Sequence, residues 1–143
     1  MRSPTRARRA AQSSEDMADA DANATVTMYR PLGPEEFALV RDSGFRRWPP
    51  RLPEQPIFYP VTNQRYAEEI AGRWNVKDSG VGYVARFAVR AAFLAPYPIQ
   101  KVGGAQHTEW WIPADVLETL NDNIVGLIEI VARFDAPLEE TSA

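Results

Sequence analysis

Proline and glycine divide this chain, from residue 26 onward, into segments of only a few residues each. Four prolines fall in the nine residues from Trp48 to Pro56. Proline fixes φ and lacks a backbone N–H donor, so this stretch is excluded from helices and inner strands and is expected to run extended over the surface. Further breaks stand at Pro31–Gly33, Asn75–Gly82 and Gly103–Gly104. The fold is therefore expected to use short strands and short helices.

Alternating apolar and polar side chains predict the strands, and apolar residues at helical spacing predict the helices. Strands are expected at 26–30, 57–61, 83–89, 98–102, 106–113 and 128–134, and helices at 34–43, 63–74 and 113–125, with a helical turn at 91–97. These elements do not alternate strictly, as they would in a parallel doubly wound sheet. The predicted class is α+β, a mostly antiparallel sheet with about three short helices packed on it.

Two helices carry specific expectations about which side chains are buried. In the helix at 63–74, Tyr66, Ile70 and Trp74 form the predicted core stripe, and Glu68, Glu69 and Arg73 are assigned to the outer face. In the helix at 113–125, Ile124 ends the buried stripe. Gly44 is the expected left-handed residue that ends the first helix.

The composition of the chain limits the number of domains that it can form and the classes of partner that it can bind. The 143 residues, 45% of them hydrophobic, suit one globular domain at 26–135, between a disordered tail at 1–25 and a loose tail at 136–143. A net charge of -3 disfavours a nucleic acid partner, and the absence of cysteine excludes disulfides and thiolate chemistry. No apolar run approaches the roughly 20 residues that span a bilayer, so we expect a cytoplasmic protein without membrane contact.

The best chemical lead is an acid on an apolar strand. Strand side chains alternate between faces, so His107, Glu109 and Trp111 are expected to project together. A hydrolytic triad, a metal centre and a phosphate-binding glycine loop are all disfavoured, because the chain has one histidine and lacks the loop motifs. An exposed glutamate at a sheet edge is the structural alternative.

Three further residues complete a candidate constellation with Glu109 and His107. An arginine such as Arg30 holds phosphate or ribose by paired hydrogen bonds, and the faces of Tyr59 and Tyr66 can stack on nicotinamide. A carboxylate can bind a ribose hydroxyl and stabilise an oxocarbenium-like centre. These groups suit cleavage of a glycosidic bond to a cationic leaving group, with Glu109 and His107 catalytic. Arg30 as a surface residue and Tyr66 as a core residue are the alternatives.

Six phrases of the sequence resemble a family of small bacterial proteins labelled "ADP-ribosylation/crystallin J1". The phrases are Tyr29-Arg30-Pro31-Leu32-Gly33, Trp48-Pro49-Pro50-Arg51-Leu52-Pro53, Gln55-Pro56-Ile57-Phe58-Tyr59-Pro60-Val61, Tyr66-Ala67-Glu68-Glu69-Ile70-Ala71, Trp74-Asn75 and His107-Thr108-Glu109-Trp110-Trp111-Ile112-Pro113. The resemblance covers roughly residues 28–134.

A more distant resemblance is to the ADP-ribosyltransferase fold. Its members carry an arginine or histidine on the first strand and a glutamate on a late strand, and Arg30 and Glu109 occupy such places in the same order. The middle serine-threonine motif is absent, and His107 stands where glutamine or glutamate is usual. The resemblance implies NAD, or another ADP-ribose compound, as a small nucleotide ligand held between Arg30, Tyr59 and Glu109.

A rival hypothesis belongs to another functional class. In it the protein is a non-catalytic ligand-binding or protein-interaction module, and Trp48, Trp110 and Trp111 line a face that binds a protein partner.

Overall fold

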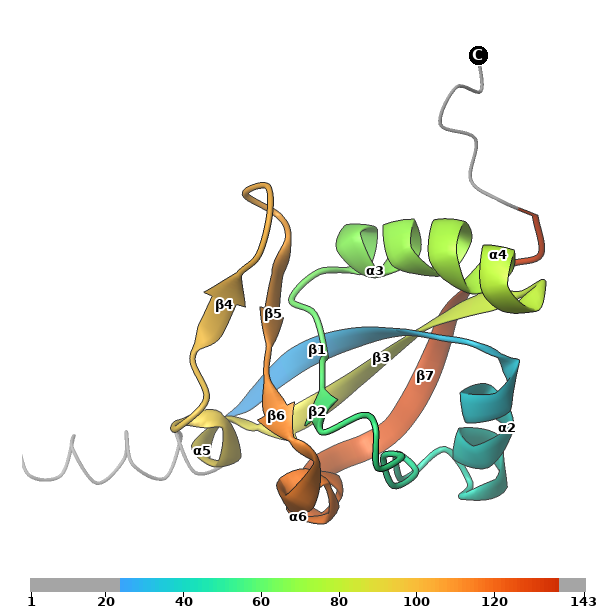
Figure 1. Ribbon diagram of the computed structural model, residues 1–143. Helices are drawn as coiled ribbons and strands as arrows, with labels where there is room; N and C mark the ends of the chain where they lie inside the picture. Colours follow the sequence, from blue (N-terminus) through green and yellow to red (C-terminus); the bar gives the residue numbers. More distant parts are fainter. Residues whose placement is uncertain (1–23, 137–143) are drawn as a thin grey trace, which may run out of the picture.

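The computed structural model describes residues 24–136 and confirms the α+β class (Figure 1). The tails expected at 1–25 and 136–143 lie, but for their innermost residues, outside this range. Every strand pairing between residues 24 and 136 is antiparallel. None of the helices in the described part is long and apolar enough to cross a membrane.

The strands form three small hydrogen-bonded groups. They are β1 (Thr25–Leu32), β2 (Ile57–Phe58), β3 (Gly82–Arg90), β4 (Ile99–Lys101), β5 (Thr108–Trp110), β6 (Ile112–Pro113) and β7 (Ile124–Phe134). The largest group has the order β1-β3-β7, and β2 pairs with β6 and β4 with β5. The long central strand β3 is thus covered along both edges.

Val61 joins these groups into one sheet. Its backbone exchanges two hydrogen bonds with Tyr29 of β1, at 2.7 and 2.9 Å, and a further bridge pairs Val61 with Glu109 of β5. The segment 57–62 therefore lies between β1 and the run β5–β6. Residues opposite one another across strands project to the same face, so Tyr29, Val61 and Glu109 share one face of the sheet.

Helices cover both faces of the sheet (Figure 1). The helices are α2 (Pro34–Asp42), α3 (Gln64–Ile70), the π-helical turn η1 (Ala71–Asn75), α4 (Val76–Ser79), α5 (Ala91–Leu94), the 3-10 turn η2 (Ala114–Val116) and α6 (Leu117–Asp122). The continuous helix α3-η1-α4 packs on one face, over Val61 and Val84. On the opposite face lies the larger core, to which α2, α5 and α6 contribute Val40, Leu94 and Leu120.

The predicted core stripe of the long helix is wrong at Trp74, whose residue surface is 62% exposed. The buried positions are instead Ala67, Ala71, Gly72 and Val76. The helix widens to a π turn at Ala71–Asn75, which contains Trp74. A π turn holds more residues than an α turn, so it shifts the phase of every side chain that follows it.

Gly82 explains how closely this helix approaches the sheet. A Cβ atom at residue 82 would lie 2.3 Å from the backbone oxygen of Ala71, which is far inside van der Waals contact. Glycine is thus the residue that permits β3 and the π turn to pack together here.

Other boundaries differ modestly from the expected ones. Strand β1 continues through Pro31, which pairs with Val84, so the predicted turn begins later. Ile124 opens β7 and does not belong to the last helix. Gly44 has φ of 77°, as predicted for the residue that ends the first helix. The proline-rich segment 48–56 forms no helix or strand.

Candidate functional site

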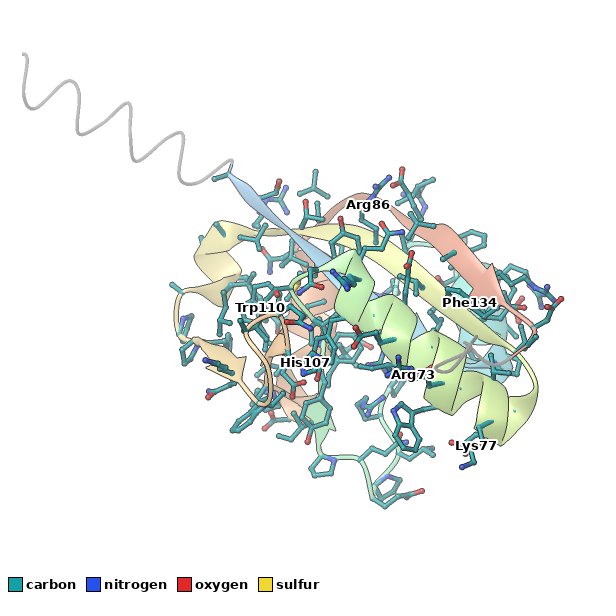
Figure 2. All side chains as sticks on the ribbon, turned by 90° about the horizontal axis from the view of Figure 1, so that it is seen from above. Arg73, Lys77, Arg86, His107, Trp110 and Phe134 are labelled. Atoms are coloured by element: carbon teal, nitrogen blue, oxygen red, sulfur yellow. The ribbon has the colours of Figure 1, made fainter. Side chains whose placement is uncertain are left out.

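The face of the sheet that carries Glu109 lies under the first turns of α3. Asn63 fixes this arrangement, since its side chain accepts a hydrogen bond from the Tyr66 N–H at 2.8 Å and caps the helix. The Asn63 amide also donates to the carbonyl of Gln106 at 2.8 Å, which ties the helix start to the turn before β5. Tyr66 and His107 are thereby held beside each other. Figure 2 labels His107, which lies next to the helix α3.

Both carboxylate oxygens of Glu109 accept hydrogen bonds from neutral donors. The Tyr66 hydroxyl donates to Oε1 at 3.2 Å, and the Trp111 indole Nε1 donates to Oε2 at 2.8 Å. Burial, the charge of Glu109 and this hydrogen bond raise the pKa of Tyr66 to about 12, with a smaller contribution from Glu69. Tyr66 is therefore a protonated donor at neutral pH, and the carboxylate is held in one orientation.

His107 is engaged through both of its ring nitrogens. Its Nδ1 accepts the N–H of Gly104 at 3.0 Å, so the neutral imidazole carries its proton on Nε2 and donates it to Glu69 at 3.2 Å. The imidazole and the Tyr66 ring lie 4.7 Å apart between centroids. Glu69, His107, Tyr66 and Glu109 thus form one connected polar network, which we call the Glu109 network.

Two exposed aromatic rings flank the Glu109 network. Phe58 pairs with Ile112, and Val61 with Glu109, so Tyr59 lies opposite Trp111 on the face of Glu109. Tyr59 and Trp111 are both more than two-fifths exposed, unlike the buried residues on either side of them. An anionic group bordered by accessible aromatic surface is an arrangement that attracts cations.

Arg30 does not join the other four predicted residues. It follows Tyr29 in β1, so its side chain projects to the face opposite Glu109. There it is only 8% exposed, makes two hydrogen bonds to Glu36 at 2.6 and 2.8 Å, and lies 4.5 Å from the ring centroid of Phe58. The expected cleft between Arg30, Tyr59 and Glu109 is therefore corrected to a site without Arg30.

The predicted tryptophan face is also corrected. Trp48 packs in the core against Phe58 and Phe87, with ring centroids 5.5 and 5.1 Å apart. Trp110 is buried because its neighbours Glu109 and Trp111 project to the outer face and it must project inward. Of the three tryptophans only Trp111 is exposed.

Glu69 also belongs to the Glu109 network, although its position in the helix predicted a side chain on the outer, solvated face. Its hydrogen bond with His107 brings a second carboxylate to the Glu109 network. The spacing of Tyr66 and Glu69 in the sequence could have indicated this, because residues three apart on a helix are neighbours on its surface.

The composition of the site bears on which ligands it can hold. In the described residues no three His, Cys, Asp or Glu side chains lie together as they would around a metal ion. Comparison with protein-family models, curated proteins and solved structures found no match to this chain. The assignment of function therefore depends on the chemistry of the site.

The raised pKa of Tyr66 predicts a pH dependence of stability. The native state favours the protonated phenol, so this stabilisation is fully present below the usual pKa of about 10 and is lost as the pH rises through about 12. From pH 9 to pH 11 the unfolding free energy of the wild type should fall relative to that of Tyr66→Phe. Urea unfolding of both proteins at each pH measures it, and an unchanged difference would contradict a raised pKa.

Proposed function

We propose that the protein binds NAD or a related ADP-ribose compound at the Glu109 network and cleaves the bond between nicotinamide and ribose. The main support is the carboxylate of Glu109, whose two oxygens are oriented by Tyr66 and Trp111 beside exposed aromatic surface. A nicotinamide ring in NAD is a pyridinium cation, which aromatic faces and carboxylates both attract.

The reaction requires a site that stabilises positive charge on the ribose. The bond between ribose C1′ and the pyridinium nitrogen breaks, its electron pair stays on nitrogen, and neutral nicotinamide leaves. Positive charge then develops on the ribose, and water adds to C1′ and loses a proton to solvent. A fixed anion close to the sugar stabilises this charge more strongly in the transition state than in the ground state. Glu109 is the residue to which we assign this role.

His107 receives a positioning role in this proposal. Both of its ring nitrogens are already engaged in hydrogen bonds, with Gly104 and with Glu69. The imidazole instead packs against Tyr66 and helps to hold the phenol that donates to Glu109. Tyr59, opposite Trp111, is proposed to contact the nicotinamide ring, and Arg30 has no part in the site.

Two measurements on the purified chain test the function. Calorimetric titration with NAD and with ADP-ribose should give saturable binding, and chromatography should detect nicotinamide released from NAD in proportion to protein concentration. ADP-ribose that binds without turnover of NAD would support a ligand-binding protein without catalysis. If neither ligand binds and no nicotinamide appears, the proposal fails, and the exposed Tyr59 and Trp111 would favour the protein-interaction alternative.

A further inference from the structure

A second region, on the face opposite Glu109, contains an arginine without an ion-pair partner among residues 24–136. A hollow of about 210 Å³ lies between α2 and the proline-rich segment. Glu35 and Leu39 line it from the helix, and Pro49, Pro50 and Arg51 from the segment. We call this the Arg51 hollow.

Arg51 makes no hydrogen bond or ion pair with any of the described residues. Its Nε is buried without a hydrogen-bond partner, and its guanidinium lies 5.8 Å from the ring centroid of Phe58. The carboxylate of Glu36, whose charge acts on Arg51, is already bound through both oxygens to Arg30. Burial and the neighbouring Arg30 cation lower the pKa of Arg51, and Glu36 and Tyr59 offset this only in part.

A second unsatisfied donor lies in the same segment. The indole Nε1 of Trp48 is buried and has no hydrogen-bond partner within residues 24–136. Trp48 lines an adjoining hollow of about 340 Å³, which shares Leu39, Pro49 and Pro50 with the Arg51 hollow. Native proteins leave few buried polar groups unpaired, and the two residues line adjoining hollows, which favours a ligand that supplies acceptors.

The chemistry of the walls narrows the class of ligand. A guanidinium in a partly buried setting binds phosphate or carboxylate through paired hydrogen bonds. Leu39 is more than half exposed and forms, with the two prolines, an apolar surface shared by both hollows. Glu35 and Glu36 at the same hollow disfavour additional negative charge. A small molecule with one compact oxyanion next to an apolar group fits these walls.

We propose that the Arg51 hollow is a binding site for such an oxyanion, with Arg51 as its principal ligand-binding residue and the apolar part of the molecule on Leu39, Pro49 and Pro50. This site is separate from the Glu109 network, because Arg51 lies with Phe58 and Arg30 on the opposite face of the sheet. Its test therefore does not depend on NAD binding or cleavage.

Phenyl phosphate, benzoate and inorganic phosphate are the probes, each titrated at constant ionic strength so that screening does not change. Phenyl phosphate or benzoate should raise the melting temperature of the full chain and give a saturable calorimetric signal, with weaker binding of inorganic phosphate. A larger effect of phenyl phosphate identifies a phosphate ester as the ligand class, and a larger effect of benzoate identifies a carboxylate.

Two variants separate a binding role of Arg51 from a structural one. Arg51→Gln should weaken binding of the better probe at least tenfold without lowering the melting temperature of the free protein, because it removes an uncompensated buried cation. Arg46→Gln, at an exposed position outside both hollows, should bind like the wild type. The proposal is overturned if no probe binds, if Arg51→Gln binds as well as the wild type, or if Arg51→Gln melts several degrees lower without ligand.

Discussion

Replacing Trp48 by alanine should lower the free energy of unfolding by about 3–5 kcal/mol, as large truncations of buried aromatic side chains do. Trp48 is 1% exposed and packs between Phe58 and Phe87 in the larger core. It also lies 5.7 Å from the Arg30 guanidinium, so the truncation removes an aromatic face from a buried cation. The loss would be a large part of a typical total stability of roughly 5–15 kcal/mol.

Trp74→Ala is the matched control, because it removes the same side chain from an exposed position. Its effect should stay within about 0.5 kcal/mol. Urea unfolding followed by circular dichroism measures both variants without relying on tryptophan fluorescence. Equal losses from the two changes would mean that the π turn is absent and that the helix continues in its expected phase, with Trp74 inside.

The contrast between these two tryptophans shows where sequence patterns stop being informative. Alternation of apolar and polar residues located the long strands β3 and β7, which are paired over many residues, although two register shifts interrupt their pairing. The phase of the long helix depends instead on the π turn at Ala71–Asn75, at the point where Gly82 of β3 approaches Ala71. The 3.6-residue spacing of apolar side chains, from which the helix was predicted, does not indicate a π turn.

The site was predictable in part for a similar reason. His107, Glu109 and Trp111 share a strand, so their common face followed from local geometry alone. Tyr66 and Glu109 are 43 residues apart in the sequence. Their residue types made both of them candidates for the site, but the sequence pattern does not predict the hydrogen bond between them. Arg30 was misplaced because the face of a strand residue depends on register. Tyr29, one residue earlier in β1, shares the face of Glu109.

Arg30 and Arg51 also show how one interpretation changes with the partners present. The sequence predicted that Arg30 binds the anionic part of a ligand. In the structure, however, Glu36 already forms an ion pair with Arg30. Arg51, in the proline-rich segment, has no such partner among the described residues. Charge pairing across distant segments therefore decides which arginine is available to a ligand, and a single sequence does not reveal it.

Glu109→Gln should lower the rate of nicotinamide release from NAD by at least about a hundredfold, since one preorganised electrostatic partner typically contributes a few kcal/mol to transition-state stabilisation. The amide keeps the shape of the side chain and removes its negative charge. One of its two polar ends also becomes a donor, so it can accept from Tyr66 or from Trp111 but not from both as the carboxylate does.

Glu129→Gln is the control for this substitution. Glu129 is an exposed strand glutamate of β7 that pairs with Arg86 at 2.7 Å and lies outside the Glu109 network. Its loss should leave the release of nicotinamide unchanged, and circular dichroism should show that both variants fold.

The pattern of the two results separates the site from the function. A wild type that releases nicotinamide and a Glu109→Gln variant that does so equally fast would leave the activity in place and remove Glu109 from its mechanism. A loss of turnover with NAD binding retained is the expected outcome, because a charge that acts on the developing cation contributes most in the transition state. Equal losses in the Glu109 and Glu129 variants would instead point to a general effect of surface charge, and the assignment of Glu109 would be wrong.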